Sequence, residues 1–344
     1  MIKPALLALA VTILVFPAQA ARADEKPEEK PKPAPFTSKI GVHLIGKYTP
    51  GTQKMVRARM PVLKILDHHG DMIQAARDYK KYNPDGIVVL RCFEPVRYTI
   101  DQDPVERAEY HWNEIYWKRM KTLSEADRKL IDYVESTNEV GECPTWEDDD
   151  STRWFTKFQI RFTELAAKEG YKHVLANIPV GNPGGPDDGR HRIRIFAPAL
   201  RHAMQHGGAW SYHAYTIQYS TDPEVEEWYS LRYRKFYEAF TGEWADLKKM
   251  PMIITEAGVD DHGNADEDGW LARGSAEKFQ NWLRWFDSEL KKDDYMIGAT
   301  LFQNGAGAAW GGWASFELES IADWLVNYWN VETAKKKPAA RLNY

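Results

Sequence analysis

The sequence lacks several motifs that would assign it to a common enzyme class. The first apolar run ends His43-Leu44-Ile45-Gly46-Lys47 without a glycine-rich turn, which argues against an open nucleotide-binding sheet. No serine stands in a nucleophile elbow. His68 and His69 are adjacent, and neighbouring side chains on a strand diverge. Because no further His or Asp set has zinc-like spacing, we expect no catalytic metal and no organic cofactor.

The chain also lacks a basic cluster. Among 344 residues, 45 are Lys or Arg and 50 are Asp or Glu, so the net charge is −5. Removing residues 1–23 takes away Lys3 and Arg22 and no acid, which leaves 43 against 50 and a net charge of −7. A mildly acidic protein has no general attraction to nucleic acid, so no nucleic-acid partner is expected.

The N-terminal segment has the pattern of a secretory signal peptide. Lys3 supplies a positive start, and an apolar run of about a dozen residues from Ala5 to Phe16 is too short for a membrane span. The small-residue sites Ala18-Gln19-Ala20 and Ala21-Arg22-Ala23 follow. The pattern predicts removal of residues 1–23, export to the periplasm or the medium, and no membrane attachment of the mature chain.

The rest of the chain predicts one folded domain. Residues 24–36 are rich in Lys, Glu and Pro, which is typical of a solvated linker. No internal Pro/Ser-rich boundary or sequence repeat interrupts residues 37–335, and residues 336–344 form a short tail. Single α/β barrels commonly have this length. We expect a monomer.

Short apolar runs alternate with longer amphipathic segments along this domain. Continuous apolar character favours parallel strands that are buried on both faces. Eight such runs occur: Ile40–Ile45, Val62–Leu66, Gly86–Arg91, Leu130–Thr137, Lys172–Ile178, Ala209–Tyr215, Met252–Glu256 and Met296–Phe302. Between them, apolar stripes at helical spacing, such as Phe279, Trp282, Leu283, Phe286 and Leu290, predict helices. Eight strand–helix units leave a doubly wound sheet or a closed barrel, and the missing glycine-rich turn favours a (β/α)8 barrel.

Polar side chains collect where the predicted strands end. Active residues of an eightfold barrel come from the C-terminal ends of its strands. Those ends provide His43, Asp67-His68-His69, Arg91-Cys92-Phe93-Glu94, Asn138-Glu139, Asn177, His213-Ala214-Tyr215, Glu256 and Gln303-Asn304. Glu139 and Glu256 are the candidate catalytic pair, because a glycosidase needs one carboxyl to protonate the leaving oxygen and another to attack or activate water. Glu135 is a rival acid that is expected to point to a different layer.

The Asn138-Glu139 dipeptide, His213-Ala214-Tyr215 and Glu256 together resemble the strand-end motifs of clan A of the glycoside hydrolases, the retaining (β/α)8 enzymes. The likeness covers nearly the whole mature chain in order and spacing. It implies that Glu139 is the general acid/base, that Glu256 is the nucleophile, that Asn138 binds the sugar 2-hydroxyl and that Tyr215 donates a hydrogen bond to Glu256. His213 would contact the ligand or serve as a structural hydrogen-bonder.

Two features depart from the clan pattern. Many members have a tryptophan at the end of strand eight, where this chain has Phe302-Gln303-Asn304. The arginine often found at the end of strand two is missing, and Arg91 on strand three is a possible replacement. Arg91 could also supply a donor that keeps Glu256 ionised, whereas Glu139 needs a drier site that raises its pKa.

Further residues are expected around the sugar. His43, Gln303 and Asn304 are candidate substrate contacts by their place at strand ends. Trp310 and Trp313 flank two glycines and could form a platform for a pyranose ring, although loop tryptophans also cap barrel cores.

Cys92 ends the third predicted strand, and Cys143 lies four residues beyond Glu139 at the end of the fourth, so adjacent strands bring both to one rim. A disulfide bracing the Glu139 loop is therefore expected, with two free buried thiols as the alternative.

The sequence therefore predicts an exported retaining glycosidase that acts on a β-linked oligo- or polysaccharide by double displacement. Two other functions stay open. One is a catalytically inactive carbohydrate-binding barrel, which would bind glycan without releasing reducing ends. The other is an exported hydrolase of different chemistry on the same fold. A separation of about 5 Å between the two carboxyl groups would indicate retention, and one of about 6.5–9.5 Å inversion.

Overall fold

The computed structural model describes residues 35–261, 267–306 and 313–335. The expected signal peptide, nearly all of the linker, the C-terminal tail and Trp310 lie outside the described residues. In the described part of the chain, no helix has the length and apolar character needed to cross a membrane.

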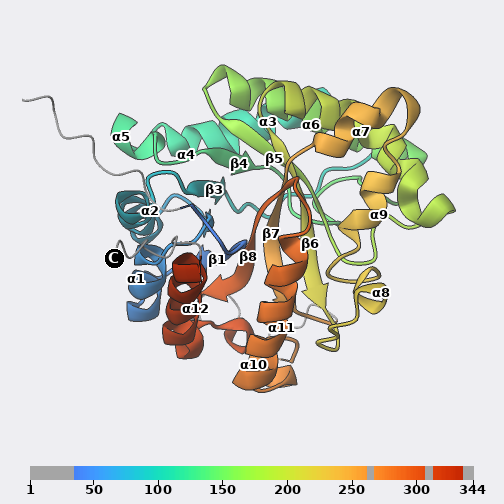
Figure 1. Ribbon diagram of the computed structural model, residues 1–344. Helices are drawn as coiled ribbons and strands as arrows, with labels where there is room; N and C mark the ends of the chain where they lie inside the picture. The colour runs from blue at the N-terminus through green and yellow to red at the C-terminus, as the bar shows by residue number, and fades with distance from the viewer. Residues whose placement is uncertain (1–34, 262–266, 307–312, 336–344) are drawn as a thin grey trace, which may run out of the picture. The chain divides into compact units, whose positions relative to one another are not determined.

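Eight parallel strands pair in chain order and close into a barrel because β8 pairs with β1 (Figure 1). The (β/α)8 prediction is confirmed, and each of the eight apolar runs overlaps one strand. The strands are β1 (Ile40–Ile45), β2 (Val62–Leu66), β3 (Ile87–Arg91), β4 (Tyr133–Glu135), β5 (Lys172–Ile178), β6 (Ala209–Thr216), β7 (Met252–Val259) and β8 (Met296–Asn304).

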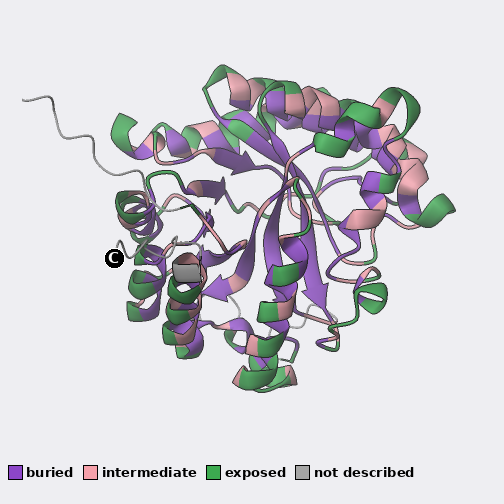
Figure 2. Ribbon diagram, in the orientation of Figure 1, coloured by how far each residue is buried: buried purple, intermediate pink, exposed green. Residues whose placement is uncertain are grey.

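Helices surround the strands on the outside (Figure 1). Figure 2 shows the strands buried and the helices exposed along one face only. The α-helices are α1 (Pro50–Arg57), α2 (Gly70–Tyr82), α3 (Pro104–Tyr110), α4 (Lys118–Met120), α5 (Glu125–Arg128), α6 (Asp149–Lys168), α7 (Arg190–Gln205), α8 (Pro223–Glu226), α9 (Tyr233–Glu238), α10 (Trp270–Arg273), α11 (Ala276–Leu290) and α12 (Ala322–Lys335). A π-helix occupies His111–Trp117, and 3₁₀ turns occupy Pro186–Gly189, Gly242–Lys249, Ala314–Phe316 and Glu319–Ile321.

The helix boundaries follow local sequence signals. Asp148 caps α6, because its side chain accepts a hydrogen bond from the Ser151 amide at 2.7 Å. Gly170 and Gly207 follow α6 and α7 with positive φ angles of 87° and 70°, a conformation that glycine adopts without a Cβ clash. Every residue of the predicted α11 stripe is buried, which confirms that this face packs against the barrel.

Side chains inside the barrel form an apolar layer with a polar layer above it. Val62 on β2 packs in the lower layer with residues of five other strands, namely Val89, Tyr133, Val174, Ala209 and Ile253. Leu63 and Ile65 belong to the larger core cluster that includes the helices. Because side chains alternate along a strand, Lys64 lies on the inner side, one step closer to the C-terminal end than Val62. The polar groups of the candidate site begin at this level.

Strand β4 ends earlier than the sequence predicts. Its last paired residue is Glu135, although the apolar run extends to Thr137. Beyond that point the Asn177 side chain donates a hydrogen bond to the Thr137 carbonyl at 2.5 Å, in place of a ladder partner. Tyr116 likewise donates to the Ser136 carbonyl at 3.1 Å. Glu139 therefore stands in the loop after β4, held by side-chain contacts.

The predicted disulfide between Cys92 and Cys143 is wrong. Both residues are free, buried thiols. The Cys143 thiol lies 3.7 Å from the Thr137 hydroxyl, and the Cys92 amide bonds to the Tyr116 hydroxyl. Burial raises the pKa of both thiols, so neither is a ready nucleophile at neutral pH.

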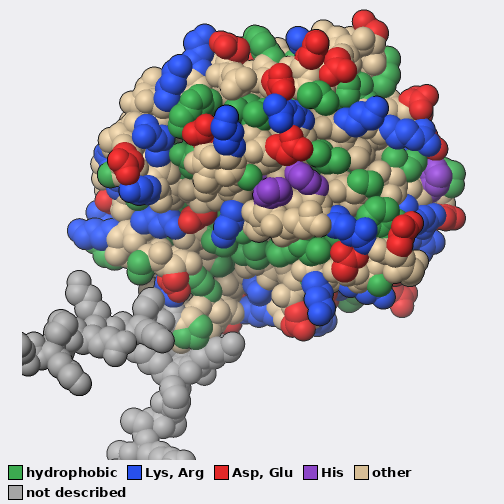
Figure 3. Space-filling view, turned by 90° about the horizontal axis from the view of Figure 1, so that it is seen from above, with side chains coloured by type: hydrophobic (Ala, Val, Ile, Leu, Met, Phe, Trp, Pro, Cys, Tyr) green, Lys and Arg blue, Asp and Glu red, His purple; other side chains and the backbone are tan. Residues whose placement is uncertain are grey.

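Charged side chains of both signs mix on the outer surface. Figure 3 shows Lys and Arg interspersed with Asp and Glu on the face seen from above. Ion pairs match this mixing, since Arg161 bonds Glu109 at 2.6 Å and Glu164 at 2.7 Å. Exposed pairs of this kind contribute little to stability.

Candidate active site

A cavity of about 320 Å³ opens at the C-terminal end of the barrel. This is the end that carries active sites in (β/α)8 enzymes, and the volume is near the lower limit of about 300 Å³ for ligand pockets. The cavity is lined by His43, Ile45, Leu66, Arg91, Phe93, Asn138, Glu139, Glu142, Tyr215, Glu256, Asp260, Phe302, Trp313 and Phe316.

Glu256 reaches this cavity from a bulged part of β7. Three residue steps of β7, from Ile254 to Ala257, match two steps of β8. The extra residue lets Thr255 and Glu256 both face the barrel interior, as bulges beside active sites commonly do. Thr255 is fixed there, because its hydroxyl lies 2.6 Å from the Ser211 hydroxyl.

The Glu256 carboxylate is surrounded by donors. The Tyr215 hydroxyl donates to its Oε2 at 2.9 Å, and the Lys64 ammonium donates to its Oε1 at 3.0 Å. His213 Nδ1 lies 3.6 Å from Oε2. Burial by itself would raise the pKa of Glu256, but the positive charges of Lys64, His213 and Arg91 outweigh burial and hold that pKa well below its ordinary value of 4.5.

The expectation of a drier site for Glu139 is wrong, because its environment is more open than that of Glu256. Its side chain is 31% exposed, against 8% for Glu256. The loop that carries it is anchored by the Asn138 amide, which donates to Glu142 Oε2 at 2.7 Å. The Glu139 carboxyl group contacts His213, whose Nδ1 lies 2.5 Å from Oε1.

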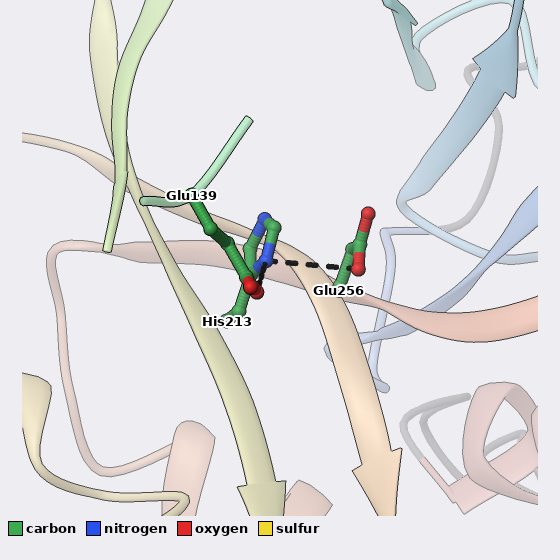
Figure 4. A group of neighbouring side chains, drawn as sticks. All are labelled: Glu139, His213 and Glu256. Carbon is green, nitrogen blue, oxygen red and sulfur yellow. Dashed lines mark hydrogen bonds and ion pairs between the residues drawn. The ribbon is translucent and has the colours of Figure 1, made fainter. Parts of the chain in front are cut away.

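His213 lies between the two glutamates (Figure 4). Its ring is fully buried on β6, and its Nε2 lies 3.2 Å from the Thr255 hydroxyl. Burial opposes charge on this ring, but Glu256 and then Glu139 raise the pKa of His213 above 6.5. One ligand atom from each of the three residues lies within 4.8 Å of the others, so a carboxylate oxygen of Glu139 is within 4.8 Å of one of Glu256.

The same three side chains have the composition of a metal site. Carboxylate and imidazole ligands at this spacing suit zinc or a similar ion. However, Lys64 already donates to Glu256, and its positive charge disfavours a cation at that carboxylate. The tight contact of His213 with Glu139 also occupies the nitrogen that a metal would need. The donor set therefore fits proton transfer better than metal binding.

The cavity wall carries polar atoms with no protein partner. Among the described residues, both ring nitrogens of His43, Nε of Arg91 and Oδ1 of Asn138 are buried and unpaired. Burial, followed by the charge of Lys64, lowers the pKa of His43 well below 6.5, so its ring is neutral and its 3.8 Å approach to Glu256 is not an ion pair. Arg91 pairs with Glu142 at 3.0 Å. Buried polar atoms without partners indicate a place for a polar ligand.

Aromatic rings form the apolar side of the cavity. Phe302 contacts Trp313 and Phe316 edge-on, with ring centroids 5.6 and 5.3 Å apart. Phe302 lines the cavity from β8. Trp313, one half of the predicted platform, lines the cavity, and Trp310 is outside the described residues. Trp112, Trp146 and Trp270, in contrast, are buried in the core.

Gln303 and Asn304 do not line the cavity. The Gln303 side chain donates to the Trp313 carbonyl at 2.9 Å and accepts from the Ala306 amide at 3.0 Å. Asn304 donates to the Thr52 hydroxyl at 2.7 Å. The side-chain amides of Gln303 and Asn304 thus bond the β8 end to neighbouring segments. Their observed positions do not support the predicted contact with substrate.

Three polar residues near the site were not among the predicted site residues. Lys64 and Glu135 are fully buried and form an ion pair at 2.9 Å, and Glu142 lines the cavity beside Arg91. Lys64 had a visible signal, because it is the one charged residue in the apolar run Val62–Leu66. Glu142 had none, since an acidic residue in a loop is ordinary.

A second cavity, of about 630 Å³, lies at the opposite end of the barrel. Its lining includes Lys39, Asp85, Lys291 and Glu332, which precede strands or end helices. These charges are paired among themselves or with neighbours, as Lys291 is with Glu332 at 2.9 Å. Active sites of (β/α)8 enzymes lie at the other end of the barrel, so the position of this cavity does not favour it as the active site.

Comparison with models of known protein families gives no match, and comparison with curated protein sequences gives none either. Solved structures with a similar fold exist. They include an endo-β-1,4-mannanase from Thermotoga petrophila, with 11% identity, a TM-score of 0.49, and coverage of 88% of this chain and 78% of that one. A glycoside hydrolase family 5 mannosidase from Rhizomucor miehei has 10% identity, a TM-score of 0.49 and coverage of 88% and 94%. A β-mannanase from Thermomonospora fusca has 14% identity, a TM-score of 0.46 and coverage of 82% of each chain.

Proposed function

We propose that the protein is an exported retaining glycoside hydrolase that cleaves a β-linked oligo- or polysaccharide, with Glu256 as nucleophile and Glu139 as general acid/base. One observation carries the proposal. Two glutamate carboxyl groups approach within 4.8 Å in one cavity, and their surroundings differ. Retaining glycosidases have carboxyl groups about 5–5.5 Å apart, whereas inverting enzymes leave room for a water molecule between them.

The first step forms a glycosyl-enzyme. A carboxylate oxygen of Glu256 attacks the anomeric carbon, the bond from that carbon to the leaving oxygen breaks, and Glu139 transfers its proton to that oxygen. Tyr215 and Lys64 support the first role, because they hold Glu256 as an anion that points into the cavity. His213 supports the second, because the raised pKa of its ring keeps a proton available at its contact with Glu139.

The second step releases the sugar. Glu139, now without its proton, takes one from a water molecule, and the resulting hydroxide attacks the anomeric carbon as the ester bond to Glu256 breaks. The product keeps the configuration of the substrate because each step inverts it once. Esterification also removes the negative charge of Glu256, which weakens the attraction that kept a proton on His213.

The cavity wall suits a sugar ring. Pyranoses present hydroxyl groups at their edge and C–H groups on their face. The unpaired atoms of His43, Arg91 and Asn138 can bond hydroxyl groups, and Asn138, next to Glu139, fits the expected contact with the 2-hydroxyl. Phe302, Phe316 and Trp313 offer apolar faces for the C–H groups.

The decisive experiment combines two variants with azide. The substrate is an activated aryl glycoside that the wild type cleaves. Glu256→Ala should reduce its turnover on the order of 10⁴–10⁶-fold, and Glu139→Ala should reduce it on the order of 10²–10⁴-fold. Azide should rescue Glu139→Ala by attacking the glycosyl-enzyme, giving a glycosyl azide with the substrate's configuration. In Glu256→Ala it can only attack the substrate directly, giving the opposite configuration.

The configurations of the azide products, read by NMR, assign the two roles. Gln303→Ala serves as a matched control, because it changes a polar residue at a neighbouring strand end that does not line the cavity. Identical configurations from both variants would refute the assignment. Glycan binding by the wild type without any release of reducing ends would instead identify an inactive carbohydrate-binding barrel.

A further inference from the structure

Lys64 and Glu135 form an ion pair inside the barrel, below the two candidate catalytic glutamates. The Lys64 ammonium lies 2.9 Å from Glu135 Oε1 and 3.0 Å from Glu256 Oε1, and the side chains of Lys64 and Glu135 are both fully buried. Neither residue lines the cavity, so a substrate that fills it would touch neither. Any effect of this pair on turnover has to act through Glu256.

The pair is not explained by stability. Withdrawing two charges from water costs several kcal/mol per ion, and apolar residues of similar volume often replace a buried ion pair at no loss. The adjacent inner layer is built that way, from Val62, Val89 and four other residues of the barrel. The charged pair appears at the level where Glu256 can be contacted, which points to a role in the chemistry of that carboxylate.

We propose that Lys64 and Glu135 are positioning residues of the hydrolase reaction: Lys64 holds Glu256 as an oriented carboxylate, and Glu135 compensates the charge of Lys64 after Glu256 has become an ester. This inference rests on the proposed function. It assigns two residues that are inaccessible to substrate to successive stages of the same double displacement.

The charges of the first step explain why both partners are present. Before attack, one ammonium faces two carboxylates, those of Glu135 and Glu256. Attack of Glu256 on the anomeric carbon removes one of these negative charges. Without Glu135, Lys64 would then be a buried cation without a counter-ion, which is among the most costly arrangements in a protein. With Glu135 at 2.9 Å, the ester stage retains a neutral ion pair.

Other charged or titratable groups also face Glu256, and they stay unchanged in the test. These are His43 on β1, Arg91 on β3, Glu139 and Glu142 after β4, His213 and Tyr215 on β6, and Asp260 at the end of β7. Because these groups are the same in every variant, a difference in the Glu256 titration between variants reports on Lys64 and Glu135.

The test measures the ionisation of Glu256 directly. Side-chain carboxyl carbons are labelled with ¹³C, the Glu256 signal is identified by its loss in Glu256→Gln, and its pH titration is followed in full-length mature protein. Lys64→Met should move the Glu256 titration up by about 1–3 pH units, because an adjacent opposite charge is lost. Glu135→Gln should move it down or leave it below the observable range, because Lys64 then has Glu256 as its single carboxylate partner.

Lys80→Met is the matched control. Lys80 also pairs with a carboxylate, that of Asp132 at 2.6 Å, but it lies on α2 outside the barrel. Its replacement should leave the Glu256 titration unchanged. Should Lys64→Met fail to fold, the Lys64→Met/Glu135→Met double variant replaces the whole pair by apolar residues and should still raise the titration point.

The outcomes separate this inference from the proposed function. An unchanged Glu256 titration in both Lys64→Met and the double variant would overturn the inference even if the wild type cleaves glycosides.

A kinetic experiment tests the second role, the compensation of the Lys64 charge by Glu135. Glu135→Gln should slow accumulation of the glycosyl-enzyme about 10-fold or more at a pH where Glu256 is ionised, since one unit of pKa corresponds to a factor of ten. An unaltered rate would refute the compensating role of Glu135. If the variants titrate as predicted but the wild type does not cleave any glycoside, the proposed function would be refuted instead.

Discussion

Glu139 and Glu256 are the same amino acid at the same end of one barrel, yet their surroundings differ. Glu256 is buried on a bulged strand with Tyr215 and Lys64 as donors. Glu139 is partly exposed on a loop and contacts His213. A carboxyl group that must attack benefits from being held as an anion in one place. A carboxyl group that must give and take protons benefits from access to water and from a titrating partner.

The difference originates in the backbone. Strand β7 continues to Val259, and Glu256 pairs with His213 of β6, so the strand ladder fixes Glu256 from that side. Strand β4 ends at Glu135, and Glu139 depends on contacts made by Asn177 and Glu142. In this barrel the nucleophile is thus placed by a strand and the acid/base by a loop. Three predictions test how far the division of roles follows from this difference.

The largest expected effect concerns leaving-group dependence. Glu139→Gln keeps the shape of the side chain but removes the proton that assists departure. Turnover of glycosides with poor leaving groups should fall about 10²–10⁴-fold, while glycosides of acidic phenols should lose far less in the first step. The measurement is kcat/KM over a series of aryl glycosides of the sugar that the wild type accepts.

Glu142→Gln is the matched control for this series. Glu142 lines the same cavity and pairs with Arg91, and a glutamine at this position retains an oxygen that can accept the Asn138 amide hydrogen bond that anchors the Glu139 loop. The slope against leaving-group acidity should therefore resemble that of the wild type. An equal loss by Glu139→Gln for every leaving group would mean that Glu139 does not protonate the leaving oxygen, and the comparison between the two glutamates would fail.

Much of the fold was predictable because parallel strands buried on both faces produce apolar runs, and eight such runs are visible. The ends of β4 and β8 were less predictable, because they depend on side chains. Asn177 replaces a backbone partner of the Glu139 segment. Phe302 faces the cavity, and the next residue on the strand, Gln303, therefore points to another side. The polarity of Gln303 at a strand end did not reveal which way its side chain points.

The candidate site was predictable where a short motif matches a chemical need, as for Glu139, Glu256 and Tyr215. It was not predictable where a residue acts from inside the barrel. Lys64 interrupts an apolar run, but its meaning depends on Glu135 and Glu256, which are 71 and 192 residues away in the chain. Cys92 and Cys143 show the reverse error, since neighbouring strand ends do not ensure that two thiols point toward each other.

A smaller effect is expected from the donor to the nucleophile. Tyr215→Phe removes the 2.9 Å hydrogen bond to Glu256 Oε2. Hydrogen bonds to charged groups are worth about 1.5–3 kcal/mol, so kcat/KM should fall about 10- to 100-fold. The acidic limb of the pH profile should move to higher pH, because loss of the donor raises the pKa of Glu256.

Tyr212→Phe provides the comparison for this variant. Tyr212 is three residues earlier on β6, is buried outside the cavity, and bonds the Tyr229 carbonyl. Its replacement should alter stability without moving the acidic limb. If the limb stays in place for Tyr215→Phe as well, the hydroxyl does not control the ionisation of Glu256, and Lys64 alone would distinguish the two glutamates.

The smallest effect is on acid stability. The pKa of Glu256 is well below 4.5 in the folded protein, so this residue contributes stability that is present above pH 4.5 and is lost as the pH falls toward the folded value. The difference in unfolding free energy between the wild type and Glu256→Gln should therefore change by on the order of 2 kcal/mol between pH 5 and pH 3, in the direction that disfavours the wild type. Urea unfolding followed by tryptophan fluorescence measures this difference in unfolding free energy.

Glu139→Gln should show a smaller change over the same interval, because Glu139 is partly exposed and lacks the ammonium contact of Glu256. Equal changes for the two variants would mean that burial and Lys64 do not set the two carboxyl groups apart.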